Sequence, residues 1–301
     1  MHTTIRYSIS RVSHFAAAIS IMCLSGLCSG QTATCTNLTT FQMPSPWIRT
    51  LPSGINRWNT AVGYTYDPGQ NTEGFIHYPN GSVKFYKAPN SSATMLSRRN
   101  VQGVTVGTYQ DTTSAHHAHG VVVYTSSTAT VNYPGAGDTF LHGINYWGSI
   151  LGAYLTSGNY RGFELKNGNF IKINFPGAAW TTPMSISDKG VIVGWYANAV
   201  GPAGVGHGHG FVFQNGVYKT LDNPKGVGGG TYLDDINSSG VIVGDYFPNE
   251  NPQGFIYING TFKDIKIPNS SGTTTSGING YGYVTGEASI SGSTGYTAHC
   301  Q

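Results

Sequence analysis

A motif that returns six times along the chain constrains its fold more than any other feature. Each copy ends on a glycine that follows an apolar stretch, and an Ile-Asn or similar pair stands eight residues before that glycine. The copies read INRWNTAVG, RNVQGVTVG, INYWGSILG, ISDKGVIVG, INSSGVIVG and INGYGYVTG, and their final glycines (Gly63, Gly107, Gly152, Gly194, Gly244 and Gly286) are 42 to 50 residues apart. The second copy is the least regular, because Arg99 replaces its isoleucine. A period in this range is typical of repeat architectures, in which each unit is one supersecondary structure.

Around each copy the sequence predicts four short strands joined by turns. In the fifth unit these are residues 231–236, 240–246, 253–258 and 261–267, and an Asn-Gly pair at 259–260 separates the last two. Asn-Gly between alternating apolar runs is the strongest short-range signal for a β-hairpin. Four-stranded antiparallel units of about 45 residues are typical of propeller blades. We therefore predict an all-β, six-bladed β-propeller of four-stranded antiparallel blades, with a sandwich or a parallel solenoid as the alternative.

The two ends of the chain fit a ring that closes on itself. The segment CTNLTTFQMPSP near the start resembles the fourth strand of a unit, whereas the sixth unit ends on STGYTAHCQ, which matches only a third strand. The N-terminal strand is thus expected to close the last blade and to remove an exposed sheet edge. This arrangement places Cys35 beside Cys300, and such a pair in an oxidising compartment most simply forms a disulfide.

The first thirty residues have the pattern of a secretory signal peptide. Arg6, Arg11 and His14 form a weakly basic start, and the apolar stretch FAAAISIMCLSGLC that follows is too short to span a bilayer. Small residues at 28–30 allow cleavage near Gly30. We predict a signal peptide over 1–30, a single six-bladed propeller domain over 31–301 and a secreted, extracellular location.

The composition agrees with this class and excludes some partners. The chain contains 42 glycines and 19 tyrosines, and only 10% of its residues are charged, which favours strands and turns over helices. The net charge of +3 falls to +1 without Arg6 and Arg11. A near-neutral surface argues against nucleic acid and against docking to acidic membranes. We expect no membrane insertion and a monomer.

The unit INxxGxIVGxY…HGFxxxNGxFxxIxxP resembles that of the bacterial extracellular HAF-repeat family. The resemblance covers residues 36–299 and is strongest in the fourth and fifth units. It implies a secreted or surface repeat protein, and it supplies no catalytic residues for this chain.

Residues that depart from the repeat are the candidates for function. Two histidine-rich segments, SAHHAHG and GVGHGHG, fall in loops between second and third strands, on the face where propellers generally bind ligands. Because His119 and His209 occupy a regular repeat position, His116, His117 and His207 are the better ligand-binding candidates. Imidazoles from two blades could bind zinc or copper. We predict no cofactor, with a divalent metal at these three histidines as the weaker alternative.

A second group of candidates lies at the end of the predicted inner strands. His142 precedes the repeat isoleucine by two residues, and Asp234 and Asp235 stand at the comparable place in the fifth unit. A histidine with a carboxylate could act as general base and acid. The alternative is that both aspartates bond turn amides, as aspartate commonly does.

Aromatic residues outside the repeat suit contacts with sugar rings. Trp147 and Trp180 do not recur, so we predict that they contribute to a binding surface. Tyr64, Tyr109, Tyr154, Tyr196 and Tyr246 do recur at one position, which indicates packing instead.

These features favour a secreted propeller that binds an extracellular polysaccharide or another cell-surface component without catalysis. The alternative is an extracellular carbohydrate-active enzyme, a polysaccharide lyase or glycoside hydrolase, with its site at the propeller mouth. The sequence carries no nucleophile elbow, phosphate loop, dinucleotide fingerprint or zinc-protease helix that would decide for an enzyme.

Overall fold

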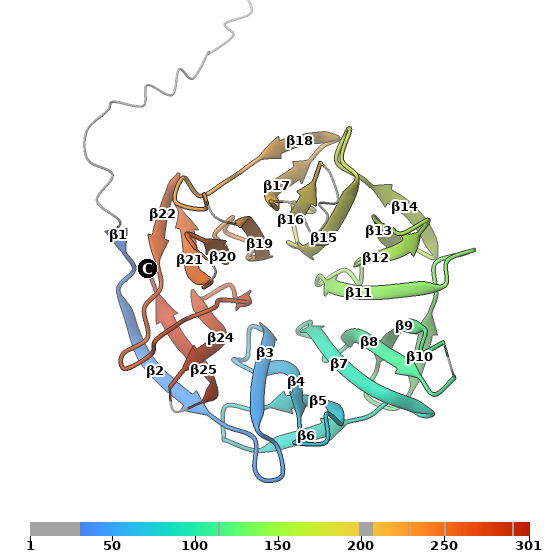
Figure 1. Ribbon diagram of the computed structural model, residues 1–301, viewed down its shortest axis with the longest axis horizontal. Coiled ribbons are helices and arrows are strands. Elements are labelled where there is room, and N and C mark those ends of the chain that lie inside the picture. Colours follow the sequence, from blue (N-terminus) through green and yellow to red (C-terminus); the bar gives the residue numbers. More distant parts are fainter. Residues whose placement is uncertain (1–30, 114, 199–206, 228, 250, 291) are drawn as a thin grey trace, which may run out of the picture.

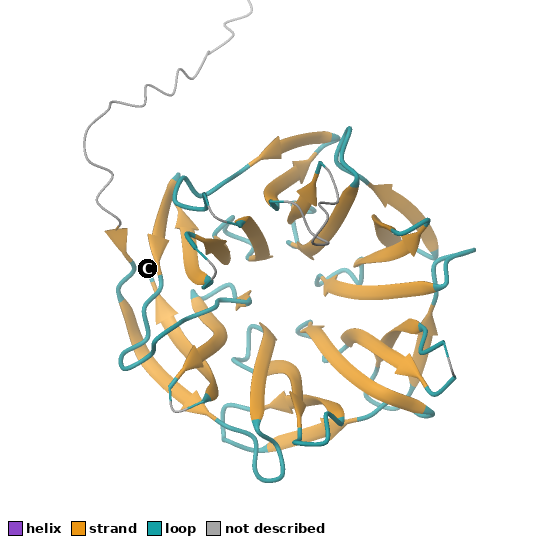
Figure 2. Cartoon of the chain, viewed as in Figure 1, coloured by secondary structure: helices purple, strands orange, loops and turns teal. Residues whose placement is uncertain are grey.

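The computed structural model describes residues 31–301 except residues 114, 199–206, 228, 250 and 291. The predicted signal peptide lies outside the described residues. Within the described part of the chain every regular element is a β-strand and no helix is present (Figure 2). This confirms the predicted all-β class.

The strands form antiparallel sets of four. In most sets the four strands are consecutive in the sequence: β3 (Arg49–Ile55), β4 (Ala61–Tyr66), β5 (Thr72–His77) and β6 (Val83–Tyr86); β7 (Ser91–Arg99), β8 (Thr105–Asp111), β9 (Ala118–Val123) and β10 (Thr128–Val131); β11 (Asp138–Ile144), β12 (Ile150–Thr156), β13 (Asn159–Lys166) and β14 (Asn169–Ile173); β15 (Trp180–Ile186), β16 (Ile192–Ala197), β17 (His209–Gln214) and β18 (Val217–Thr220); β19 (Gly230–Ile236), β20 (Ile242–Phe247), β21 (Gln253–Ile258) and β22 (Thr261–Asp264). The sets stand radially around a common axis, and the first strand of each lies nearest to that axis (Figure 1). This arrangement confirms the predicted propeller.

The remaining set joins the two ends of the chain. It contains β23 (Gly277–Ile278), β24 (Tyr283–Ser289) and β25 (Ser293–Cys300), and its outer strand is β2 (Cys35–Phe41). Cys35 lies opposite Cys300 in the β2–β25 ladder, with 4.2 Å between their Cα atoms, and the two form a disulfide. The predicted N-terminal closing strand and disulfide are both confirmed. In addition, β1 (Gln31–Thr32) pairs in parallel with β22 of the neighbouring set.

The repeated residues form the core between neighbouring sets. We call the final glycine of each motif copy its anchor glycine. The residue before the anchor glycine has no exposed surface in any copy: Val62, Val106, Leu151, Val193, Val243 and Thr285. The same holds for the residue that follows the glycine of each third strand: Phe75, Val121, Phe163, Phe211, Phe255 and Tyr296. The anchor glycines allow first and second strands to approach closely. A Cβ on Gly244, for example, would lie 2.0 Å from the carbonyl oxygen of Tyr232, so no larger residue fits there. The motif is thus explained by packing.

Candidate functional site

The last residues of the first strands line the central channel. In β3, β7, β11, β15 and β19 the pairing with the second strand shifts register just before the motif, as between Leu233 and Asp235. A β-bulge places two residues opposite one, so successive side chains no longer alternate strictly between the faces of the sheet. Asp234 and Asp235 therefore both face the channel, at successive levels.

Residues at equivalent repeat positions surround two cavities along this channel. The smaller, of about 180 Å³, is lined by Arg98 and by the residues two places before the motif: Ser53, Ser97, His142, Met184, Asp234 and Ser276. The larger, of about 400 Å³, is lined by the motif residues and by the turns that join first and second strands. We call the end of the molecule that carries these turns the turn face. The opposite end, with the loops between second and third strands, is the loop face.

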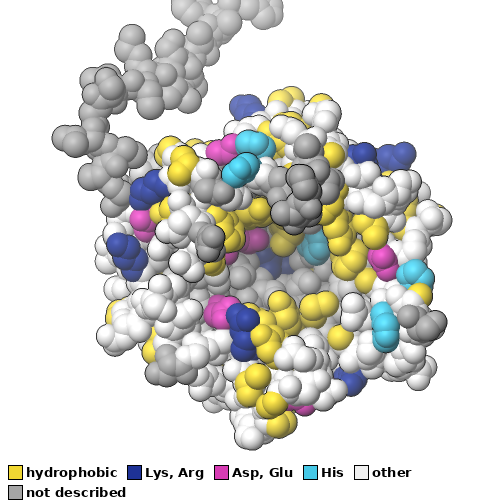
Figure 3. Space-filling model, viewed as in Figure 1, with side chains coloured by type: hydrophobic (Ala, Val, Ile, Leu, Met, Phe, Trp, Pro, Cys, Tyr) yellow, Lys and Arg dark blue, Asp and Glu magenta, His cyan; other side chains and the backbone are white. Residues whose placement is uncertain are grey.

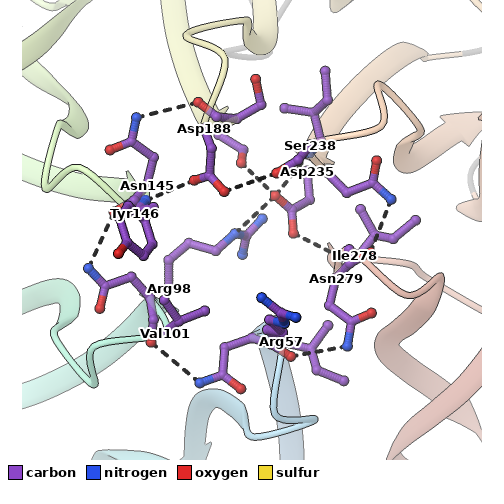
Figure 4. A pocket seen from close by; sticks show the side chains of 18 of the residues that line it. Arg57, Arg98, Val101, Asn145, Tyr146, Asp188, Asp235, Ser238, Ile278 and Asn279 are labelled. Carbon is purple, nitrogen blue, oxygen red and sulfur yellow. Dashed lines mark hydrogen bonds and ion pairs between the residues drawn. The ribbon is translucent and has the colours of Figure 1, made fainter.

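Arg98 separates the two cavities, because its side chain lines both. Its Nη2 atom donates hydrogen bonds to the backbone oxygens of Asp234, at 2.6 Å, and of Ser276, at 2.8 Å. The guanidinium therefore connects β7 with the far side of the channel, and only 8% of the residue is exposed. Figure 4 shows this side chain reaching toward Asp235 in the centre of the channel. The channel is blocked at this level by a charged side chain that satisfies backbone acceptors.

Asp235 is held in place by donors from three sets. Its carboxylate accepts hydrogen bonds from the Ser185 hydroxyl and from the backbone N–H groups of Ile236, at 2.9 Å, and Ile278, at 2.8 Å. Arg98 Nε lies 3.5 Å from Asp235 Oδ1 and adds charge compensation. The donors and the cation around this buried carboxylate already satisfy its oxygen atoms. Asp235 was predicted as a catalytic residue, with bonds to turn amides as the alternative; the amides that it bonds belong to strands β19 and β23.

The asparagine of the motif forms a belt around the larger cavity. Each asparagine accepts backbone hydrogen bonds from its own turn through Oδ1 and donates through Nδ2 to a backbone oxygen of the next set. These donor bonds run Asn56 to Asn100, Asn100 to Asn145, Asn145 to Ser187, Asn237 to Asn279 and Asn279 to Asn56, at 3.0–3.4 Å. The fourth copy has Ser187 in place of the asparagine. There the Asp188 carboxylate accepts hydrogen bonds from Tyr146 N and Ser238 Oγ instead. The recurrent Ile-Asn pair is therefore a tie between sets.

Exposed aromatic side chains lie in the turns of the turn face, and two of them, Tyr146 and Tyr281, line the larger cavity. Trp58, Tyr146, Trp147 and Tyr281 lie in the turns and are 61%, 47%, 73% and 54% exposed. Trp147 packs edge-on against Tyr146 and donates from its indole N–H to the backbone oxygen of Asp188, at 3.0 Å. Large apolar side chains are rarely this exposed together unless the surface binds something. The predicted ligand-binding residue Trp147 thus lies on the turn face, opposite to the loop face on which the histidine-rich loops were expected.

His142 and Asp234 share the smaller cavity, which places two predicted catalytic residues together. Burial, together with the charge of Arg98, lowers the pKa of His142 to about 4, although the contact of its Nδ1 with the Pro183 oxygen, at 3.0 Å, opposes the shift. Burial raises the pKa of Asp234 well above its usual range, and the neighbouring charge of Asp245 adds to this. At neutral pH the imidazole is therefore uncharged, and the Asp234 carboxyl beside it holds its proton to a higher pH than an ordinary aspartate does.

The lowered pKa of His142 predicts a loss of stability in mild acid. Between pH 6.5 and about 4 the unfolded chain binds a proton at this histidine that the folded chain does not, so folding is disfavoured as the pH falls through this range. The free energy of unfolding should be measured with urea at pH 7 and at pH 4.5. Its decrease between the two pH values should be larger by about 2–3 kcal/mol in the wild type than in His142→Asn, which lacks this proton site. Equal losses would mean that His142 is accessible to protons in the folded state.

The histidines that the structure describes in the two histidine-rich loops line neither cavity. His117 pairs with Asp138, at 3.2 Å, and the regular repeat histidine His119 contacts Asn132 and Asp111. His116 and His207 are exposed. On the loop face, shown in Figure 3, histidine side chains lie near the outer edge as well as beside the central hollow. Among the described residues no three His, Cys, Asp or Glu side chains are grouped as metal ligands, so the metal hypothesis gains no support and stays a prediction.

The other predicted aromatic residue lies away from both cavities. Trp180 begins β15, donates to Asn159 Oδ1 at 3.1 Å and packs edge-on against Tyr160. The recurrent tyrosines pack as expected in the later units, where Tyr154 and Tyr196 are buried and stacked on Tyr133 and Phe175.

Several residues of the site were not singled out from the sequence. Arg98 stands where most units have a glycine or serine, so it departs from the repeat as clearly as the histidines do. Arg57, Tyr146 and Tyr281 occupy the variable positions of the turns, and comparing those positions across the six copies would have found them. Nothing in the sequence places Trp58 and Trp147 beside one cavity without the ring.

Comparisons with known proteins support the fold. No protein-family model and no curated protein matches this chain. Among solved structures it is similar to TolB from Acinetobacter baumannii, at 10% identity over 80% of this chain and 64% of that chain, with a TM-score of 0.51. It is also similar to an Aleuria aurantia lectin mutant in complex with Fucα1-6GlcNAc, at 12% identity over 81% and 90% of the two chains, with a TM-score of 0.50. A puromycin hydrolase mutant matches at 11% identity over 82% of this chain but only 44% of its own, with a TM-score of 0.51.

At such low identity these similarities concern the fold alone. TolB and the lectin are β-propeller proteins, in agreement with the radial arrangement of the sets. A search of the described residues for an apolar helix long enough to cross a bilayer finds none.

Proposed function

We propose that this chain is a secreted, six-bladed, monomeric β-propeller of the HAF-repeat type that binds an extracellular polysaccharide at the turn face, without catalysis. The observation that carries the proposal is the cavity of about 400 Å³ that Tyr146 and Tyr281 line, with Trp58 and Trp147 exposed in the same turns. Sugar rings combine apolar faces with hydroxyl edges, so they suit a site in which aromatic rings surround polar groups. Polar residues line the cavity wall, among them the arginine Arg57 at the exposed end.

The other parts of the proposal have separate support. Six motif copies and a final set completed by β2 favour six blades. The Cys35–Cys300 disulfide suits an oxidising location, which agrees with the signal-peptide pattern of residues 1–30. The HAF-repeat assignment is supported by the motif resemblance over residues 36–299.

The proposal predicts that Trp147→Ala weakens binding without unfolding the protein. Trp147 is 73% exposed, so its removal should change the unfolding free energy by about 0.5 kcal/mol or less. Affinity for the bound polysaccharide should fall about tenfold or more, because truncated tryptophans are commonly the most costly residues of an interface. Affinity electrophoresis in gels that contain each member of a polysaccharide panel would measure this.

A matched control comes from another exposed aromatic residue. Tyr124 follows β9 and is 45% exposed, but it lies between the outer strands β9 and β10, whereas Trp147 contacts Tyr146 and Asp188 of the cavity wall. Tyr124→Ala should therefore retain wild-type affinity. If both variants bind equally well, the turn face is not the binding surface, and if no polysaccharide is retained by the wild type, carbohydrate binding is wrong.

The enzyme alternative is favoured by one observation, the neutral imidazole of His142 beside the Asp234 carboxyl, whose pKa is raised by burial, in the smaller cavity. A base and an acid in those states could act on a sugar that reaches the loop face. The same panel should then release new reducing ends or unsaturated products, and His142→Asn should abolish that release. Retention of polysaccharide without any product would leave binding as the function.

A further inference from the structure

The charges that line the larger cavity are not balanced. Three arginines, Arg57, Arg98 and Arg99, face two aspartates. Both carboxylates are already occupied: Asp235 by Arg98 and three hydrogen-bond donors, and Asp188 by Tyr146 N and Ser238 Oγ. Among the residues that the structure describes, no carboxylate lies within 4.0 Å of a nitrogen of Arg57 or Arg99. The cavity therefore presents uncompensated positive charge.

Arg57 is the exposed part of this charge, and aromatic residues hold it at the rim. Its Nε and Nη2 atoms both donate to the hydroxyl of Tyr281, at 3.0 and 2.8 Å. The guanidinium carbon lies 5.3 Å from the ring centre of Tyr281 and 5.8 Å from that of Trp58. In Figure 4 Arg57 and Asp188 occupy opposite sides of the cavity. An arginine oriented in this way retains donors for a ligand and loses little conformational freedom on binding.

The base of the cavity also contains an unused donor. Arg98 Nε is buried and has no hydrogen-bond partner among the described residues, since Asp235 Oδ1 at 3.5 Å is beyond hydrogen-bond length. Arg99, by contrast, donates through Nη1 to Gly103 O and Thr105 Oγ1. The positive charge of the site therefore comes from Arg57 at the rim and from Arg98 below it, whose hydrogen-bond donors are only partly used.

We infer that the saccharide bound at the turn face is acidic, and that Arg57 binds a carboxylate of a uronic acid residue while neighbouring aromatic rings contact the sugar faces. The inference rests on the proposed carbohydrate-binding function and adds the class of sugar. A planar carboxylate matches the two-donor geometry of a guanidinium, and charge-assisted pairs of this kind are about twice as strong as neutral hydrogen bonds.

Matched polysaccharide pairs test the inference. Hyaluronan, polygalacturonate, alginate and xanthan would each be compared with its carboxyl-reduced form in affinity electrophoresis, together with neutral dextran and xylan, and bound oligosaccharides would be titrated by calorimetry. The wild-type protein should be retarded by at least one acidic polymer, and carboxyl reduction should weaken that binding about tenfold or more.

Two charge variants separate a specific site from general electrostatics. Arg57→Gln should weaken acidic-oligosaccharide binding about tenfold or more. Lys189→Gln removes the same charge from a neighbouring turn, but Lys189 does not line the cavity, so its effect should be less than about twofold. Equal effects of the two variants would overturn the role of Arg57.

The outcomes distinguish this inference from the proposed function. Retention of neutral and carboxyl-reduced polymers as strongly as their acidic parents overturns acidic specificity but leaves carbohydrate binding intact. Retention of none of the polymers rejects both. Binding of sulfated dextran with no uronate polymer bound would mean that the site takes a sulfate instead of a carboxylate, which also overturns the inference.

Discussion

Asp235→Ala should lower the free energy of unfolding by about 3–5 kcal/mol, because it leaves the buried charge of Arg98 without a partner. The substitution also removes the acceptor of the Ser185 hydroxyl and of the Ile236 and Ile278 backbone N–H groups. Each unsatisfied buried donor adds to the cost. Urea unfolding at neutral pH, followed by tryptophan fluorescence, would measure the change.

Asp222→Ala is the matched control for this prediction. Asp222 also pairs with a basic side chain and a backbone N–H, those of His209 and Gly210, but it lies at the surface. Its removal should cost about 1 kcal/mol or less. A comparable loss in both variants would show that the channel pair is not special. The double variant Arg98→Met with Asp235→Leu should recover much of the stability, since it removes both buried charges.

Replacing both Cys35 and Cys300 with serine should lower the free energy of unfolding by about 4–5 kcal/mol. The disulfide closes a loop of 265 residues, so it restricts nearly the whole unfolded chain. In the folded state β2 remains hydrogen-bonded to β25, and we expect the ring to form without the bond. The dependence of unfolding free energy on urea should also become steeper, because the unfolded chain expands.

A comparison under reducing conditions is the control for the disulfide prediction. Wild-type protein that is unfolded and refolded with excess dithiothreitol should match the double serine variant. An oxidised protein that is no more stable than the variant would contradict the chain-entropy account. A variant that fails to fold at all would mean that the bond is needed to dock β2.

Most of the fold could be predicted because its causes are local and repeated. The anchor glycine before Tyr64 or Tyr246, the hairpin at Asn259 and the buried residue before each anchor all depend on neighbours in the same unit. Six copies of one pattern make such local signals strong enough to predict the propeller. The unmatched strands at the two ends likewise predicted that Cys35 would meet Cys300.

The candidate site could be predicted only in part. The repeat register placed His142, Asp234 and Asp235 at the channel, as the structure has them. It could not predict that Asp234 and Asp235 line different cavities, because this follows from a β-bulge that puts the two neighbours at successive levels of the channel. Asp235 bonds backbone amides and faces Arg98, whereas Asp234 lies in a separate cavity where burial raises the pKa of its carboxyl.

The sequence by itself thus determined the strands, their order and the closure of the ring, since each depends on residues close in the chain or on a repeat. Only the tertiary structure decided which residues share a site. Arg57 meets Tyr281 and Arg98 meets Asp235 across 224 and 137 positions of the chain, through contacts made between sets. The repeat pattern does not predict such pairs, because they form only when the ring closes and brings distant units around one channel.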